Sequence, residues 1–189
     1  MPATWGACHV IRLFVGLDLP LATRQRLSML AGGVPGAAWV DPAMLHLTVR
    51  FIGEVEEHVA EEIDHSLSRL IFSPFELTLA GVGHFEAKGR PTALWAGVER
   101  SAALLSLREK VESALRRAGI GADGQRYSPH VTLARLKDPP VHRLRNFLLG
   151  NALFRDGPIP IAAVTLFSSH LARSGAVYVP EAAYRLAGA

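Results

Sequence analysis

The sequence carries the stretch HLTVRF at residues 46–51, and the same pattern returns as HVTLAR at residues 130–135. In each copy a threonine follows a histidine by two positions inside an apolar run, a pattern typical of a β-strand. Strand side chains alternate between two faces, so the histidine and threonine of each copy share one face. One copy could arise by chance, but two copies in matching contexts indicate a joint role. The side chains concerned are His46, Thr48, His130 and Thr132.

The overall composition is that of an ordinary globular protein and excludes several classes of protein. The chain has 189 residues, 49% hydrophobic and 20% charged, which is enough for a substantial core. Its net charge of +3 suits a phosphorylated ligand or a nucleic-acid end, not the coating of long nucleic acid. The single cysteine, Cys8, excludes an internal disulfide and a cysteine-rich metal cluster. No apolar run could span a bilayer and no secretory signal is recognisable, so we expect a cytoplasmic protein.

Strand and helix patterns alternate along the rest of the chain. Residues 1–10 are expected to form a lead-in, and residues 83–91 a loop. The strands expected outside the two histidine stretches lie at 11–17, 75–82, 93–98 and 159–170, and the helices at 21–31, 54–70, 102–118 and 141–149.

The order of these elements repeats, which predicts an internal duplication within one domain that spans residues 1–189. One copy covers residues 11–82 and the other residues 93–170, and a C-terminal hairpin follows at 175–187. Two related halves suggest a pseudo-two-fold axis. If both histidine strands lie near that axis, the two imidazoles face one cleft.

Two opposed imidazoles are suited to general acid–base catalysis. Histidine titrates near neutral pH, so one ring can accept a proton while the other donates one. Opening a phosphodiester needs both tasks, because the attacking water loses a proton and the leaving ribose oxygen gains one. Threonine hydroxyls can donate to the non-bridging phosphate oxygens, and an arginine can neutralise the charge that develops there.

These motifs resemble those of the 2H phosphoesterases, which are named for paired His-x-Thr signatures. Within that superfamily the chain is most similar to the bacterial and archaeal RNA 2',3'-cyclic phosphodiesterases, historically called 2'-5' RNA ligases. The resemblance implies an α+β fold of two pseudo-symmetric lobes, each an antiparallel sheet with outer helices, and an active-site cleft between them. The stretches that carry it are RLFVGLDLP from Arg12, HLTVRFIGEV from His46, LWAGV from Leu94, SPHVTLARL from Ser128 and GAVYVPEAAYRL from Gly175.

The resemblance also implies a role for each matching residue. His46 corresponds to the proton donor and His130 to the proton acceptor, whereas Thr48, Thr132 and Arg135 correspond to the phosphate-binding residues. The implied activity opens 2',3'-cyclic RNA ends to 2'-phosphates without a metal or another cofactor. RNA ends or small cyclic nucleotides are therefore the expected substrates. We expect a monomer with no obligate protein partner and no membrane association.

Other interpretations of the same residues remain open. Each histidine alone could be structural, and a zinc site would need further ligands that do not accompany the pair at a suitable spacing. The cleft could belong to a catalytically idle module that binds RNA ends or nucleotides, or to a phosphodiesterase for 2'-5' linked or small cyclic nucleotides. The aromatic residues Trp39, Phe85 and Trp95 could stack on a base or pack in the core.

Strict alternation places the two arginines of the histidine stretches on opposite faces relative to their histidines. Strict alternation places Arg50 on the face of His46, where a phosphate contact and a salt bridge at the rim are both compatible with the sequence. The same alternation directs Arg135 away from His130, against the family match. A β-bulge near Ala134 would reconcile the two, because a bulge adds a residue and redirects the next side chain. The alternative for Arg135 is a carboxylate contact that ties the lobes together.

Overall fold

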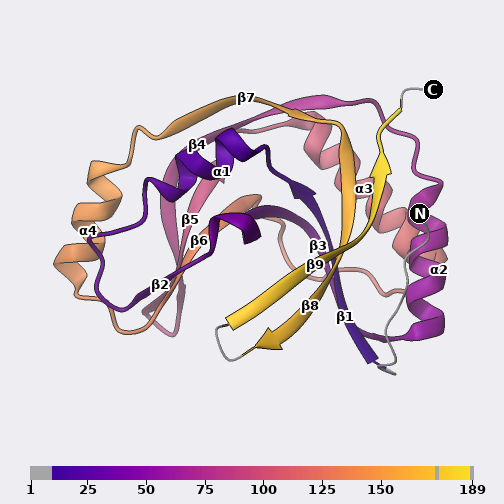
Figure 1. Ribbon diagram of the computed structural model, residues 1–189, viewed down its shortest axis with the longest axis horizontal. Coiled ribbons are helices and arrows are strands. Elements are labelled where there is room, and N and C mark those ends of the chain that lie inside the picture. The colour runs from indigo at the N-terminus through magenta and orange to yellow at the C-terminus, as the bar shows by residue number, and fades with distance from the viewer. Residues whose placement is uncertain (1–9, 173–174, 188–189) are drawn as a thin grey trace.

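The computed structural model describes residues 10–172 and 175–187, whose strands form one curled antiparallel sheet (Figure 1). The strands are β1 (Val10–Asp18), β2 (Ala37–Trp39), β3 (His46–Glu56), β4 (Phe75–Ala87), β5 (Arg90–Val98), β6 (His130–Leu136), β7 (Arg155–Ile161), β8 (Ala163–Ala172) and β9 (Gly175–Arg185). The helices are α1 (Leu21–Ser28), α2 (Glu57–Ser68), α3 (Ala102–Arg117) and α4 (Val141–Gly150), with a 3-10 turn, η1, at Pro42–Met44. The α+β class predicted from the sequence is confirmed.

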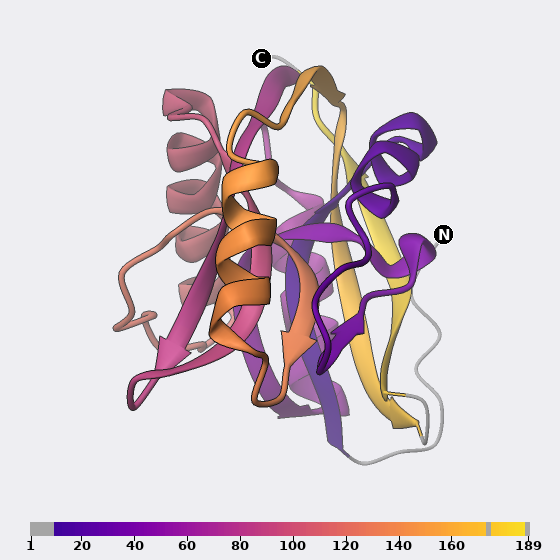
Figure 2. The ribbon, with the colours of Figure 1, turned by 90° about the vertical axis from the view of Figure 1, so that its left-hand side faces the viewer.

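The strand order places the two histidine stretches in the middle of the sheet. The order is β7-β4-β5-β6-β3-β1-β8-β9, and β2 pairs with β6 beside this path. Strands β3 and β6 pair through Leu47 and Val131, so the two lobes share one continuous sheet. Helices α2 and α3 lie side by side at one end of the molecule, and α4 lies at the other (Figure 1). In Figure 2 helix α4 faces the viewer, in front of the sheet.

The hydrophobic core takes one face of the two central strands. Leu47 and Val49 on β3, and Val131 and Leu133 on β6, are at most 3% exposed. Helices α2 and α3 contribute apolar residues to the same core, which their 3.6-residue periodicity predicts. Burial of each such leucine stabilises the fold by about 1.5–3 kcal/mol. The opposite face, which carries both histidines and both threonines, is left half-exposed.

Several predicted boundaries are wrong. The central strand β3 continues to Glu56, so α2 begins three residues later than predicted, and α1 ends at Ser28 instead of residue 31. Strand β4 continues to Ala87 and turns directly into β5, so residues 83–91 form a hairpin instead of a loop. The apolar run 159–170 spans parts of two strands, β7 and β8. The C-terminal segment is the single strand β9, and its hairpin partner is β8. The predicted lead-in lies almost entirely outside the described residues.

The halves of the sheet do not coincide with the two ranges proposed as repeats. Strand β4 comes from the range 11–82 but pairs with β5, and β8 comes from the range 93–170 but pairs with β1. The duplication therefore stays a prediction. If it occurred, the two repeats have exchanged their last strands.

Candidate active site

His46 and His130 each open a strand, and each is held by a carbonyl two residues earlier in the chain. The Nδ1 atom of His46 lies 2.7 Å from the Met44 carbonyl oxygen, and that of His130 lies 2.7 Å from the Ser128 carbonyl oxygen. A carbonyl only accepts hydrogen bonds, so each Nδ1 carries the proton. In the neutral ring, Nε2 is then the atom with the free lone pair, which is the tautomer that a general base needs.

The pairing of β3 with β6 gathers both motifs on one face. Because Leu47 pairs with Val131 in an antiparallel register, the flanking positions bring His46 opposite Thr132 and Thr48 opposite His130. The two histidines are then diagonal neighbours, for which a Cβ separation of about 7–8 Å is typical. A phosphate group fits between imidazoles at such a separation, with a threonine beside each. The structure thus brings together the four side chains that the sequence singled out.

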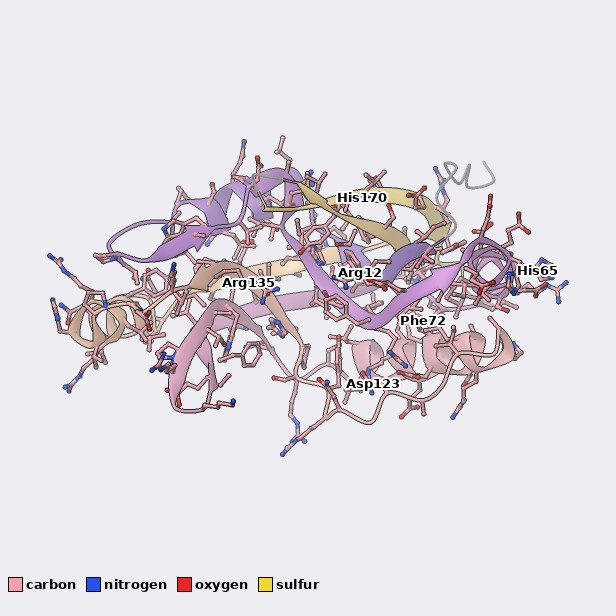
Figure 3. The ribbon with its side chains drawn as sticks, turned by 90° about the horizontal axis from the view of Figure 1, so that it is seen from below. Arg12, His65, Phe72, Asp123, Arg135 and His170 are labelled. Carbon is pink, nitrogen blue, oxygen red and sulfur yellow. The ribbon has the colours of Figure 1, made fainter. Side chains whose placement is uncertain are left out.

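Both histidine strands carry a bulge just after the threonine. On β6, Thr132 pairs with Trp95 of β5 and Ala134 pairs with Leu94, so Leu133 is the extra residue. Leu133 and Ala134 are consecutive buried residues, and the bulge returns the exposed Arg135 (labelled in Figure 3) to the face of His130, whose pKa it lowers. The irregularity predicted near Ala134 is present.

The corresponding bulge on β3 has the opposite effect on Arg50. Thr48 pairs with Gly16 of β1 and Arg50 pairs with Val15, so Val49 is the extra residue. Arg50 is directed to the buried side and is 8% exposed, with its Nε atom 2.6 Å from Glu112. Of the two alternatives for Arg50, the structure shows the salt bridge, in the interior instead of at the rim. Phe51 takes the position on the His46 face instead, and is 59% exposed.

Aromatic rings surround both imidazoles. Tyr178 of β9 meets His46 edge to face at 4.9 Å between ring centres, and Phe14 of β1 lies at 4.8 Å. Phe85 of β4 meets His130 edge to face at 4.7 Å. Two of these rings pack against His46 and one packs against His130, which restricts the orientations of both imidazoles. The rings also displace water from the parts of the imidazoles that they cover.

The other two aromatic candidates have different surroundings. Trp39 packs on Phe147 at 5.7 Å and belongs to the core periphery, so its packing interpretation holds. Trp95 pairs with Thr132 on the cleft side and is half-buried against Phe85 and Gly83. Its indole Nε1 is buried with no hydrogen-bond partner among the described residues.

A pocket of about 340 Å³ opens beside His130. Strand β3 forms one wall and the segment that follows α3 forms the other, with Phe85 between them (Figure 3 labels Asp123 in that segment). Its lining includes Thr48, Arg50, Phe51, Phe85, Gln125, Arg126, Tyr127 and His130. The pocket therefore combines aromatic rings with an amide and guanidinium groups, and His130 forms part of its wall.

The charges around the two imidazoles differ in sign. Burial lowers the pKa of His46, while the Met44 carbonyl and the Asp18 carboxylate oppose this effect. Burial also lowers the pKa of His130, and the Arg135 guanidinium lowers it further, against the Ser128 carbonyl. His46 thus has a nearby group that favours its protonated form, and His130 has one that favours its neutral form.

Within the described residues, no group of three or more His, Cys, Asp and Glu side chains is arranged to hold a metal ion. Among the same residues, no helix has the length and apolarity that crossing a membrane requires.

Sequence reasoning missed Asp18 and Tyr178. Both reach His46 only through strand pairing, since Asp18 pairs with His46 across β1 and β3, and Tyr178 comes from β9. Neither lies at a recognisable spacing from the histidine. A correct strand order would have been needed to find them.

Comparison with known proteins identifies a family whose members are similar to this chain over the region of the site. The family model described as the 2'-5' RNA ligase superfamily matches residues 23–171, which include both histidine stretches. An RNA 2',3'-cyclic phosphodiesterase of Aeropyrum pernix is 36% identical over 162 residues, covering 82% of this chain and 89% of the relative. One from Thermotoga maritima is 29% identical over 174 residues, covering 89% and 91%.

Solved structures of similar proteins share the fold of this chain. The structure of TT0787 from Thermus thermophilus superposes with a TM-score of 0.76 at 26% identity, covering 94% of this chain and 98% of that one. E. coli LigT complexed with 3'-AMP superposes with a TM-score of 0.74 at 24% identity, with the same coverage. With the family model matching most of the chain, the protein belongs to the 2'-5' RNA ligase superfamily, the 2H phosphoesterases.

Proposed function

We propose that this protein hydrolyses 2',3'-cyclic phosphate ends of RNA to 2'-phosphomonoesters. The observation that carries the proposal is the placement of two imidazoles on one face of the sheet, each with its Nδ1 atom bound to a carbonyl. Relatives with the printed name RNA 2',3'-cyclic phosphodiesterase, at up to 36% identity, support the substrate class.

In the proposed reaction the two histidines act as a base and an acid. His130, neutral at the start, takes a proton from water at its Nε2 atom as the water oxygen bonds to phosphorus. The bond between phosphorus and the ribose 3'-oxygen breaks, and His46 donates its Nε2 proton to that oxygen. The product keeps the phosphate on the 2'-oxygen. The surrounding charges support this assignment, because Asp18 favours a charged His46 and Arg135 favours a neutral His130.

The remaining site residues are proposed to hold the phosphate. The hydroxyls of Thr48 and Thr132, one beside each histidine, donate to its non-bridging oxygens. Arg135, returned to this face by the bulge, places a positive charge beside the oxygens as negative charge develops on them.

The pocket beside His130 is proposed to receive the base of the terminal nucleotide. Phe51 and Phe85 offer ring faces for stacking, which contributes about 1–3 kcal/mol per base. Phe51 is the better test because it is exposed. Phe51→Ala is expected to raise KM for an RNA end, with little effect on folding.

The decisive experiment uses an RNA oligonucleotide with a defined 2',3'-cyclic phosphate end. Phosphorus NMR of the product is expected to show a 2'-phosphomonoester, and none should form with His130→Ala. If the wild-type protein binds the oligonucleotide and leaves it intact, it is an idle binding module. Preferential turnover of 2',3'-cyclic mononucleotides or of 2'-5' linkages would change the assigned substrate.

A further inference from the structure

The two histidines are anchored by backbone segments of very different kinds. The anchor of His46, the Met44 carbonyl, belongs to η1, a short turn capped by the Asp41 carboxylate, which accepts a hydrogen bond from the Ala43 amide at 2.8 Å. The anchor of His130, the Ser128 carbonyl, ends a segment of residues 118–129 that contains neither helix nor strand. Such a segment needs side chains to hold its shape.

A buried ionic network holds the first part of this segment. Arg50 donates from Nε to Glu112 of α3 at 2.6 Å and from Nη2 to the Gly121 carbonyl at 2.8 Å. Arg108, one turn earlier on α3, lies 3.6 Å from Glu112 and 3.3 Å from Asp123. Arg50 thus links the first histidine strand to the segment that leads to the second histidine.

Tyr127 holds the last part of the segment. Its ring lies under the Arg108 guanidinium, at 4.6 Å from the ring centre, and its hydroxyl donates to the Thr48 carbonyl at 3.1 Å. Burial raises the pKa of Tyr127, so the hydroxyl stays protonated and remains a donor. The next residue is Ser128, whose carbonyl fixes His130.

We propose that Arg50 is a positioning residue for His130: through Glu112 and Gly121 it fixes the segment 118–129, and thereby the Ser128 carbonyl that holds His130 in the tautomer of a general base. This deepens the proposed function and rests on it. Part of the Arg50 side chain lines the proposed base pocket, but its guanidinium is bound to Glu112 and to the Gly121 carbonyl, so its effect reaches the reaction through the orientation and tautomer of one imidazole. Among the described residues the anchor of His46 is held without an ion pair: Asp41 caps η1, and the preceding Val40 amide donates to the Leu133 carbonyl of β6 at 2.9 Å.

Arg50→Met tests the proposal, since methionine keeps much of the apolar volume and removes the charge and the donors. Two-dimensional nitrogen NMR of the imidazoles reports the tautomer of each histidine without any substrate. We expect wild-type His130 to carry its proton on Nδ1, and the variant to gain a population protonated on Nε2, with His46 unchanged. Turnover of a cyclic-phosphate RNA end is expected to show a kcat about tenfold lower and a KM within about twofold of wild type.

The pH profile gives a second readout. The charged groups that face His130 are His46 on β3 and Arg135 on β6, and Arg50, Asp123 and Arg126 line the adjoining pocket. Arg50→Met removes one of these charges, whereas Tyr127→Phe removes none, so a shift of the limb assigned to His130 that appears in both variants reports the altered imidazole anchor and the displaced segment. The limb assigned to His46 should stay in place.

Arg26→Met is the matched control. Arg26 on α1 also pairs with a largely buried carboxylate, Asp156 at 3.2 Å, and also donates to a carbonyl, that of Arg155 at 2.9 Å. It is expected to lose stability without changing either tautomer or kcat. Arg50→Lys restores a charge for Glu112 but lacks the fork that reaches the Gly121 carbonyl, so it should recover part of kcat.

Should Arg50→Met fail to fold, Tyr127→Phe removes only the hydroxyl that binds the Thr48 carbonyl and should change His130 in the same direction. The proposal is overturned if folded Arg50→Met, or Tyr127→Phe in its place, keeps the wild-type His130 tautomer and kcat. It is also overturned if both histidines change equally or if Arg26→Met gives the same effect. If wild-type protein does not turn over the RNA end, the proposed function fails, whereas the tautomer measurement still decides this inference.

Discussion

Replacement of Arg135 by alanine tests two effects that the bulge on β6 gives to this residue. The guanidinium is exposed on the face of His130, where it lies beside the proposed phosphate and also lowers the pKa of the imidazole. Arg135→Ala removes both effects. Because the side chain is exposed, the melting temperature should change little.

The expected loss of activity in Arg135→Ala depends on how strongly solvent screens the charge of the exposed guanidinium. At a separation of about 4 Å, two unit charges interact by about 1 kcal/mol in water and about 4 kcal/mol near a protein surface. The cleft lies between these limits, so we expect a loss of about 2–3 kcal/mol of transition-state stabilisation, or roughly 30- to 160-fold in kcat/KM.

Arg135→Ala should also shift the pH dependence of kcat/KM, in a direction that follows from the role of His130 as a base. A general base works in its neutral form, so activity falls on the acid side of its pKa. Arg135 lowers the pKa of His130, and its removal should therefore move the acidic limb of the kcat/KM profile to higher pH. Arg135→Lys keeps the charge but not the planar fork, so it should lose less activity and leave this limb nearly unmoved.

The assay is the initial rate with a cyclic-phosphate RNA end across the pH range, together with thermal unfolding. Arg145→Ala, which removes an exposed arginine from α4, is the control for the overall charge. A sharp fall in melting temperature with normal turnover of the folded fraction would show that Arg135 is structural. An unmoved acidic limb in Arg135→Ala would refute the electrostatic argument.

Three further predictions concern the histidine pair. His46→Ala and His130→Ala should each lose most of kcat with folding intact, and the double variant should be little worse, because groups that act as a unit are non-additive; additive losses would contradict this. The dependence of kcat/KM on pH should be bell-shaped with its optimum below neutrality, because burial lowers the pKa values of both histidines. The kcat profile should lie at higher pH, because the bound phosphate anion favours the imidazolium form of each histidine. Activity should survive dialysis against a strong chelator, and a loss that zinc restores would disprove the metal-independent reaction.

The arrangement of the candidate site was largely predictable because it depends on local geometry. A spacing of two within a strand places His46 with Thr48, and His130 with Thr132, whatever the rest of the sheet does. Arg135 was predictable only because the family match conflicted with alternation, which indicated a bulge. No such conflict existed for Arg50, so alternation alone left it on the wrong face.

The connectivity of the sheet was much less predictable, because it depends on pairings between distant segments. Nothing within Val10–Asp18 indicates that β1 will pair with β8 at the far end of the chain. The run 159–170 reads as one strand because β7 and β8 are separated by a single residue, Ala162, which is itself apolar. Non-local pairing of this kind has no signature in a short window of sequence.

The position of β8 beside β1 has a consequence for how the chain is made. Strand β1 lies between β3 and β8, so one of its edges stays open until Ala163–Ala172 has been synthesised. At about 5–20 residues per second, roughly 8–30 s pass on the ribosome between the end of β1 and the end of β8. During that time the nascent chain exposes an apolar strand edge of the type that templates aggregation. Tyr178 emerges later still, so the aromatic surroundings of His46 are complete only when nearly the whole chain has left the ribosome.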